Sequence, residues 1–486
     1  MSEEQDRINL ANEISKHEND MNDYFLLIMA WFVLLMQFGF AFLEAGSVRA
    51  MNTVNIIWKN ILDFFIGALV FWAVGFAFAF GDLPEDHPHA SSNRFIGLKF
   101  FFDMGNPYEP ERSGFAFWIF MFSFAVNAAT IVSGSVAERS QIGAYIIYTT
   151  FITGFIFPVV AHWSWTETGW LRNPKIENFY RHDYSSNGTF FYDQNQPVQF
   201  IDFAGSAVVH CTGGVAGLIG AWFMGPRGGR FGKENEGLFF GHSVPLINLG
   251  FLFLFIGFLC FNGGSELAIV GPGNHGTTVA KIFVNTILGG SAGGIVSLAY
   301  NYLTLRWKRG YADISLYYLM NGALAGWVAI AAGSNSLTQA YSLLVGSLGA
   351  LFMIFSKNLL EKFEIDDPLT ASPIHLGGGL VGIFLTPIFK HDGLIAFDIC
   401  PVQELEYIRK YPNGTDFRCD FFEWKVLGWN IAGTLAILVW TIALSGAVFW
   451  SLKKLKLLRV PASIEKYGLD KLKHGEDAYP LDSYFG

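Results

Sequence analysis

The sequence predicts an all-α integral membrane protein with eleven transmembrane helices, built as an inverted repeat of five plus five helices followed by a final helix. Three observations lead to this fold class: an apolar composition, a series of long apolar stretches, and a pattern repeated within them. Of the 486 residues, 52% are hydrophobic and 15% are charged, whereas a soluble protein has about 25% charged residues. The 49 Phe residues exclude a disordered chain, and four Cys residues are too few for a disulfide scaffold.

Eleven stretches have the length of about 20 mostly apolar residues that a helix needs to cross a bilayer. They are rich in Gly, Ala and Ser, which let helices approach one another closely in a membrane bundle. The expected helices cover residues 24–45, 61–81, 115–136, 142–161, 203–224, 243–262, 277–300, 314–332, 338–356, 371–388 and 426–450. Because eleven is odd, the two termini are expected on opposite sides of the membrane.

The loops between these stretches predict the orientation. Basic residues such as Arg49, Arg139 and Arg306 follow odd-numbered stretches, whereas the loops at 263–276 and 333–337 have none. Because Lys and Arg prefer the cytoplasmic side, we expect an extracellular N-terminus and a cytoplasmic C-terminus. Glycosylation sequons and two cysteines agree, because they fall in loops that this orientation places outside. These are the glycosylation candidates Asn187 and Asn413 and the disulfide candidates Cys400 and Cys419.

Two short patterns recur five stretches apart. GFAFLEAGS at 39–47 returns as GFLCFNGGS at 257–265. Asp202 stands eight residues before His210, and Asp367 stands eight residues before His375, each time with a glycine pair after the histidine. Since five is odd, the second copy must enter the membrane upside down. Inverted repeats are typical of transporters that handle substrate near the midplane, although a Gly-rich chain also repeats short patterns by chance.

The two histidines occupy equivalent positions of the repeat, so a pseudo-two-fold axis would bring His210 and His375 face to face. Ionisable side chains inside a bilayer are costly and usually functional. The alternative is two separate structural histidines, each bonded to a helix carbonyl or a hydroxyl. A neutral imidazole both donates and accepts hydrogen bonds, and its usual pKa of about 6.5 suits a proton relay.

Several classes of function lack support in the sequence. The net charge of -9 offers no basic field for nucleic acid. The chain has no P-loop, no Gly-x-Ser-x-Gly elbow and no Cys/His spacing typical of metal sites. We therefore expect no enzyme, no cofactor and no metal.

Long stretches of the chain resemble the Amt/Mep/Rh ammonium transporter family, and its Amt branch in particular. The resemblance extends from about residue 24 to the C-terminal tail. It is carried by FLEAGSVRAMNTVNIIWKNILDF at 42–64, SGSVAERSQ at 133–141, FAGSAVVHCTGGVAGLIGAWFMGPRGGRF at 203–231, FNGGSEL at 261–267 and IHLGGGLVG at 374–382. It implies a homotrimer in the lipid bilayer of the plasma membrane, with ammonium or ammonia as substrate and methylammonium as its analogue.

The resemblance also implies functional residues. An outer recruitment site would comprise Phe120, Phe124, Trp165 and Ser265, the stacked phenyl gate Phe124 and Phe261, and the pore His210 and His375. Without the resemblance, single aromatics in a span would indicate packing or lipid contact. Asp202 and its counterpart Asp367 have expected structural and electrostatic roles, for Asp202 first as a helix N-cap. Glu44 and Asp63 resemble family positions with structural roles at the ends of spans.

Such a site suits ammonium. Aromatic rings attract a small cation by about 0.5–2 kcal/mol each, but a narrow bore lined by Phe and His disfavours an unpaired charge by far more. The resemblance therefore implies recruitment of NH4+, deprotonation at the gate and passage of NH3 past the histidines, with or without a relayed proton. The alternatives are an ammonium sensor that signals through its tail, and an Rh-like channel for ammonia or carbon dioxide gas. Trp165 and Ser265 argue against the gas channel.

The expected domain organisation follows from these parts. Residues 1–23 form an extracellular tail, and 24–450 form the transmembrane domain, with repeats at about 24–224 and 243–388 and the last helix at about 426–450. Residues 451–486 form a cytoplasmic regulatory tail. Within this tail, Gly468, Asp470, His474, Gly475 and Tyr479 match the tail pattern of Amt proteins, while Leu472 replaces a threonine that plant relatives can phosphorylate.

Overall fold

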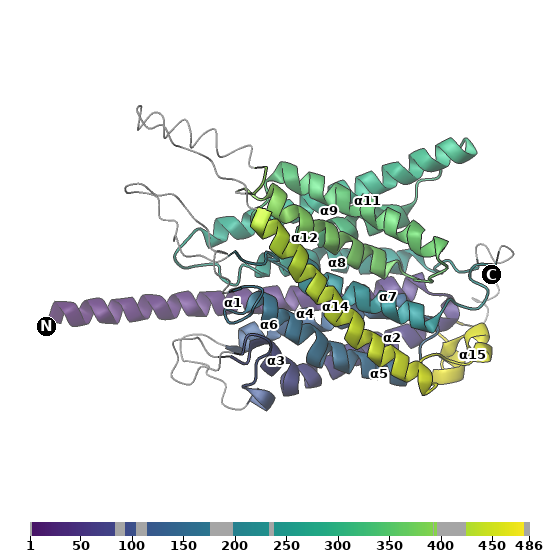
Figure 1. Cartoon of the computed structure of the whole chain (residues 1–486), viewed down its shortest axis with the longest axis horizontal. Helices are drawn as coiled ribbons and strands as arrows, with labels where there is room; N and C mark the ends of the chain where they lie inside the picture. The colour runs from purple at the N-terminus through teal and green to yellow at the C-terminus, as the bar shows by residue number, and fades with distance from the viewer. Residues whose placement is uncertain are drawn as a thin grey trace.

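The computed structural model describes residues 2–82, 93–103, 114–174, 198–232, 238–391, 393–395 and 424–480. Within these ranges the protein is built of helices, with two isolated β-bridges and no β-strand. The beginning of helix α1 (Ser2–Ser47) and the short helix α15 (Ala462–Tyr467) lie at opposite ends of the molecule (Figure 1).

The helices overlap the apolar stretches that predict them, although the second begins at Thr53 and not near residue 61. Among the described residues, nine helices are long and apolar enough to cross a membrane, and two shorter apolar helices occupy the eighth and tenth predicted positions. The protein is thus a multi-pass helical membrane protein, while the count of eleven crossings stays a prediction. The main helices are α1 (Ser2–Ser47), α2 (Thr53–Val70), α3 (Phe76–Phe80), α4 (Gly114–Ser135), α5 (Ile142–Phe151), α6 (Phe157–Trp165), α7 (Thr212–Met224), α8 (Val244–Gly264), α9 (His275–Arg309), α10 (Leu316–Ile330), α11 (Gln339–Lys362), α12 (Gly378–Phe389) and α14 (Trp424–Lys454).

Helix α1 differs from the expectation at its N-terminal end. It begins at Ser2 and not near residue 24, so the acidic segment expected as a tail continues the first span as one helix of 46 residues. The physical reason lies in the composition of this segment, which contains no Gly or Pro before Gly39. Nothing local therefore ends the helix before the apolar stretch begins.

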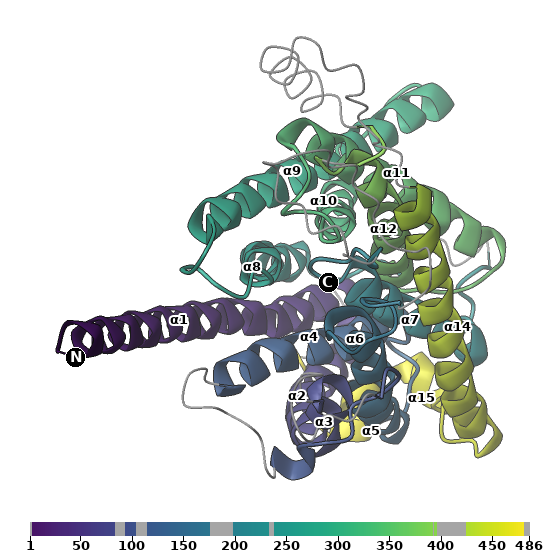
Figure 2. The same ribbon diagram turned by 60° about the vertical axis from the view of Figure 1, so that its left-hand side comes forward.

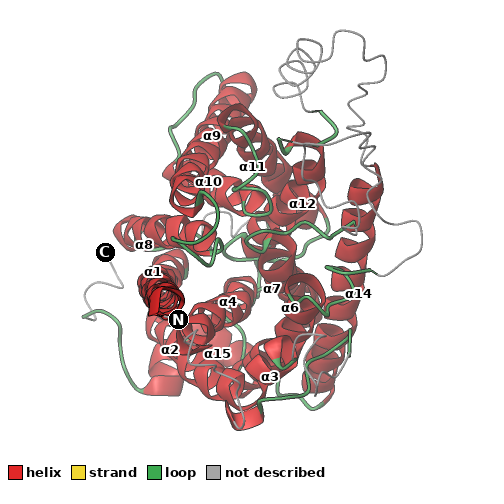
Figure 3. Ribbon diagram, turned by 90° about the vertical axis from the view of Figure 1, so that its left-hand side faces the viewer, coloured by secondary structure: helices red, strands yellow, loops and turns green. Residues whose placement is uncertain are grey.

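The two predicted repeats form two neighbouring groups of helices. Viewed along the helices, one side holds α1, α2, α3, α4 and α6 and the other holds α8 to α12, with α7 between them (Figure 3). Helices α1 and α8, the first helices of the two halves, pack along each other. Gly250 permits this contact, because a Cβ there would lie 2.3 Å from the backbone nitrogen of Leu43. Helix α14 runs across the outside of α7 and α12 (Figure 2).

Four π-helical turns interrupt the spans: η2 (Phe71–Gly75), η4 (Ile152–Ile156), η5 (Ser206–Cys211) and η7 (Pro373–Gly377). The turns η5 and η7 open the spans that contain α7 and α12, and they contact each other at the centre of the bundle. Because π-helical turns are rare and frequently mark functional sites, the centre is the first place to look for one.

Candidate functional site

His210 lies in η5 and His375 in η7, and their side chains meet in the core. The two Nδ1 atoms are 3.1 Å apart. The ring centroids are 5.2 Å apart, and the ring planes differ by 22°. Since one Nδ1 must donate a proton that the other accepts, at least one of the two rings is neutral.

Glycines let the two histidine segments come this close. A Cβ on Gly214 would lie 2.5 Å from the backbone nitrogen of Leu376, and a Cβ on Gly379 would lie 2.4 Å from the backbone oxygen of Ser206. At each glycine, the backbone of the other segment therefore occupies the space that a side chain would need. The glycine pairs that follow the histidines in the sequence thus serve the crossing of the two segments.

Asp202 and Asp367 cap the two segments. The carboxylate of Asp202 accepts hydrogen bonds from the backbone nitrogens of Gly205, Ala207 and Val208 at 3.1, 2.8 and 2.9 Å. That of Asp367 accepts from Ala371 and Ser372 at 3.1 and 2.7 Å. These bonds satisfy amide groups that a helix start leaves without partners, and a negative charge there meets the positive end of the helix.

Aromatic side chains cover the histidines on one side. The rings of Phe124 and Phe261 stack with centroids 4.0 Å apart and planes 13° apart. Phe120 lies 4.9 Å and Trp165 lies 5.8 Å from Phe124, again between centroids. The hydroxyl of Ser265 donates to the carbonyl of Phe261 at 2.9 Å. The five residues expected for recruitment and gating therefore form one cluster.

The cluster and the histidines form a continuous file. The centroid of Phe261 lies 5.3 Å from that of His210, and beyond the second imidazole the centroid of Phe40 lies 6.1 Å from that of His375. His210 and the two stacked Phe rings are at most 1% exposed. Among the described residues, no hydrogen-bond partner is found for Nε2 of His210. A buried polar atom of this kind calls for an explanation, and a polar molecule moving along the file would supply one.

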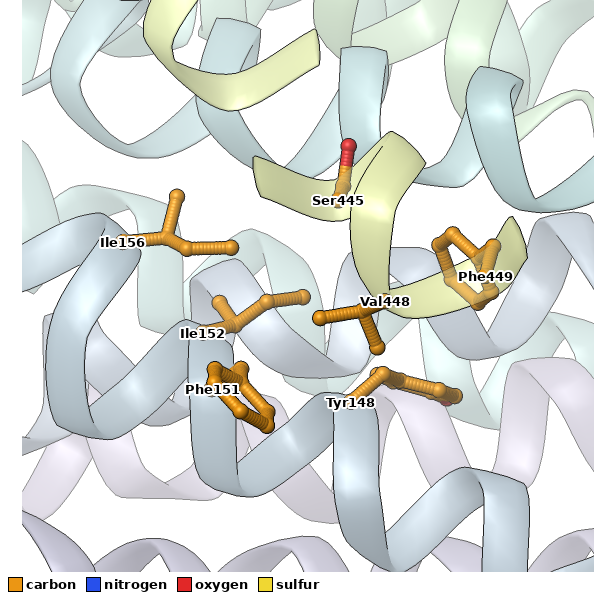
Figure 4. Close-up of a pocket in the computed structure, with 7 residues that line it drawn as sticks. All are labelled: Tyr148, Phe151, Ile152, Ile156, Ser445, Val448 and Phe449. Atoms are coloured by element: carbon orange, nitrogen blue, oxygen red, sulfur yellow. The ribbon is translucent and has the colours of Figure 1, made fainter. Parts of the chain in front are cut away.

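A small cavity lies beyond His375, and the sequence did not reveal it. Its volume is about 20 Å³, and Glu44, Leu43 and Phe40 of α1 line it together with His375. The repeat contained one signal, since Glu44 aligns with Asn262 of the second copy. A second, apolar crevice lies between α5, η4 and α14 (Figure 4), where Tyr148, Ile152 and Phe449 are among the lining residues. It offers no charged group to a cation.

Other expected sites lie outside the described residues. They are the glycosylation candidates Asn187 and Asn413 and the disulfide candidates Cys400 and Cys419. The remaining two cysteines, Cys211 and Cys260, are buried free thiols. Within the described ranges, no group of three or more metal-ligating side chains comes together.

Comparisons with known proteins identify the family. The model of the Ammonium Transporter Family matches residues 24–479. A putative ammonium transporter 1 of Caenorhabditis elegans is 38% identical over 476 residues, covering 97% of this chain and 81% of the relative. Ammonium transporter 1 member 3 of Solanum lycopersicum is 36% identical over 471 residues, covering 95% of this chain and 93% of the relative.

Solved structures share the fold. A protein described as a sensor Amt protein superposes with a TM-score of 0.75 at 29% identity, covering 94% of this chain and 99% of the other. Mep2 of Saccharomyces cerevisiae superposes with a TM-score of 0.70 at 22% identity, covering 91% and 89% of the two chains. With its family model, its relatives and its fold in agreement, the chain belongs to the ammonium transporter family.

Proposed function

We propose that the protein recruits NH4+ at the aromatic cluster, removes one proton at the phenyl gate and conducts NH3 past the two histidines into the cytoplasm. The observation that carries this proposal is the imidazole pair with Nδ1 atoms 3.1 Å apart, buried behind stacked Phe rings. Such a file offers a neutral amine hydrogen-bonding partners. It offers a bare cation no counter-charge of its own.

Free energies favour transport of the neutral species. Moving an unpaired charge into a medium of low dielectric constant costs on the order of tens of kcal/mol. Removing a proton from an amine with a pKa of about 10.4 costs about 5 kcal/mol at pH 7. Because Na+ and K+ have no proton to lose, the same barrier excludes them.

Individual residues receive roles in this scheme. Phe120, Phe124 and Trp165 attract the cation through their rings, and Ser265 offers it a hydroxyl oxygen. The unpaired Nε2 of His210 is the first base that a substrate meets behind Phe261. Asp202 holds the start of its segment in place and adds a favourable potential for a cation.

The wider proposal concerns the cellular setting. Residues 24–450 act as the transport domain in the plasma membrane of the cell, as part of a homotrimer with the N-terminus outside. Residues 451–486 act as a cytoplasmic regulatory tail. No catalytic step is assigned to any residue, in keeping with a family of transporters.

The test is uptake of labelled methylammonium, and the current evoked by ammonium, in oocytes that express the wild type, His210→Leu, His375→Leu or the double variant. We expect uptake per molecule of protein to fall at least tenfold in the double variant. His162→Gln is the matched control, because His162 is buried with both ring nitrogens near backbone carbonyl oxygens, away from the histidine pair. An unchanged and still selective flux in the double variant would refute the assignment of the pore.

A sensor is the second candidate, and one observation favours it. Part of the C-terminal tail, η8 (Asp470–His474), is docked on the start of α2, where a change in the bundle would reach it. Ammonium binding to the purified wild type without any uptake in oocytes would favour this candidate over the transporter.

A further inference from the structure

The cavity beyond His375 contains a second titratable group. Glu44 and His375 are the two titratable residues among those that line it, and the others are apolar, among them Leu43, Phe258 and Ile374. A volume of about 20 Å³ is enough for one water molecule, or for one ammonia molecule of similar size. A substrate that has passed the two imidazoles therefore meets the carboxyl group of Glu44 next.

The surroundings of Glu44 leave hydrogen-bonding capacity unused. Glu44 is 1% exposed. Oε2 accepts a hydrogen bond from Nδ2 of Asn60 at 2.7 Å, and Oε1 accepts a short one from the hydroxyl of Ser133. The ionised carboxylate has about four acceptor positions, so two remain. Among the described residues, no Lys, Arg or His makes a salt bridge with it, and Lys59 attracts it only from beyond salt-bridge distance.

The repeat shows that the architecture does not require an acid at this position. The equivalent residue of the second half is Asn262, whose amide donates to the hydroxyl of Thr286 at 3.1 Å. Glu44 and Asn262 thus make the same kind of contact, each with the helix that follows in its own half. The acid is a departure from the repeat, and it lines a cavity that residues of both halves enclose.

We propose that Glu44 is the inner proton-exchange group of the pore, a role that rests on the transport function proposed above. NH3 that leaves His375 takes the proton from the carboxyl group of Glu44. The O–H bond breaks, an N–H bond forms, and the products are NH4+ and a carboxylate. The carboxylate then receives the proton that the substrate gave up at His210 and that reached His375 along the imidazole pair. In each cycle one NH4+ disappears outside and one forms inside, so transport carries one positive charge.

The test compares current with methylammonium uptake in the same oocytes for the wild type, Glu44→Gln, Glu44→Asp and Asp63→Asn. Asp63 is the matched control, because it is an equally buried carboxylate of the same half that bonds Tyr145, Thr149 and Thr130 and does not line the cavity. We expect Glu44→Gln to lower the ratio of charge to methylammonium at least tenfold, since glutamine cannot release a proton. Glu44→Asp should restore much of the ratio. Asp63→Asn removes a neighbouring charge but leaves the carboxyl group of Glu44 in place, so it should change the ratio far less than Glu44→Gln does.

A loss of packing would lower current and uptake by the same factor, so the ratio separates the proton-exchange role from a structural one. An unchanged ratio in Glu44→Gln, or a wild type that takes up methylammonium without current, would overturn the role of Glu44 and leave the proposed transport intact. A wild type without uptake would instead overturn the transport function itself.

Discussion

The two sides of the histidine pair are built from equivalent helices but differ in the side chains that meet there. On the side of His210, Phe261 of α8 stacks on Phe124 and closes the file. On the side of His375, the equivalent residue of α1 is Leu43, and a cavity opens beside Glu44. A duplicated scaffold can thus place a stacked aromatic pair on one side and a small cavity with a carboxyl group on the other, because the repeat fixes the backbone and leaves the side chains free to differ.

The same contrast continues one helix further. Lys59 of α2 donates to the carbonyl and hydroxyl oxygens of Ser140 at 3.1 and 2.8 Å. Asn285 of α9 donates to the carbonyls of Ser334 and Leu337 at 2.8 and 3.0 Å. Each side chain ties its helix to the turn after the next helix of the same half. The first half does this with a lysine and the second with a neutral amide. The type of side chain therefore differs between the halves, while the contact is the same.

The largest expected effect tests the feature that the two halves share. Gly214→Ala and Gly379→Ala each place a Cβ within 2.5 Å of a backbone atom of the opposite segment. Overpacking of this kind costs about 1–3 kcal/mol or more, and we expect both variants to lose uptake at least tenfold. The measurement is uptake together with the monodisperse fraction on size-exclusion chromatography. Gly446→Ala is the control, since a Cβ there meets nothing within 4 Å. A loss of uptake in only one of the two variants would show that the two glycines do not contribute equally where the histidine segments cross.

A smaller effect is expected from exchanging the side chains that distinguish the two sides. Leu43→Phe fills the cavity, and we expect it to lower uptake several-fold because the exit narrows. Phe261→Leu removes a stacked aromatic pair that contributes about 0.5–1.5 kcal/mol, and we expect methylammonium uptake to fall less than in Leu43→Phe and K+ to evoke no current, because the barrier against an unpaired charge remains. Both are measured in oocytes at matched protein levels. If Leu43→Phe transports like the wild type, the cavity is not on the path of the substrate.

The smallest effect concerns the tail, which contacts one side of the molecule. Asp470 accepts hydrogen bonds from the backbone of Val54 and Asn55 at 3.0 and 2.9 Å. Nε2 of His474 lies 2.9 Å from the amide nitrogen of Asn55, and its ring stacks on Trp58. The amide group of Asn55 can only donate here, so Nε2 must accept and the ring must be neutral.

Burial lowers the pKa of His474 below its usual value. A base whose pKa falls on docking stabilises the docked tail fully above its free pKa of about 6.5, and this contribution is lost as the pH falls. We expect hydrogen exchange of residues 470–474, corrected for its intrinsic pH dependence, to rise two- to tenfold between pH 7.5 and 5.5, as the loss of about one hydrogen bond implies. Burial also raises the pKa of Asp470, which gives docking of the tail a second pH dependence. The comparison is therefore with His474→Ala, because this variant keeps Asp470. An equal pH dependence in His474→Ala would contradict the prediction.

Much of the fold could be predicted because its main signal is local. A span is recognised by apolar length alone, and the recurrence of Asp202 with His210 and of Asp367 with His375 was enough to expect the imidazoles together. The resemblance to the family, and not any spacing, supplied Trp165 and Ser265. The start of α1 at Ser2 was missed because hydropathy reports where lipid begins and not where a helix begins.

The cavity beside Glu44 and the π-helical turns at both histidines could not be predicted. Whether space remains next to Glu44 depends on how α1, α4, α8 and η7 pack, and these segments are far apart in the sequence. A carboxylate near the end of a span looks the same in the sequence whether it packs against neighbours or faces a cavity.

The sequence by itself determined that this chain enters a membrane as a bundle of helices and that its halves are copies of each other, because hydrophobicity and repetition are properties of the residues in order. The tertiary structure decided which copies of a residue stack on an aromatic neighbour, pair with their counterpart or line a cavity. That decision depends on close packing between distant helices, where a single Gly, Leu or Phe sets whether two side chains touch or leave room for a molecule between them.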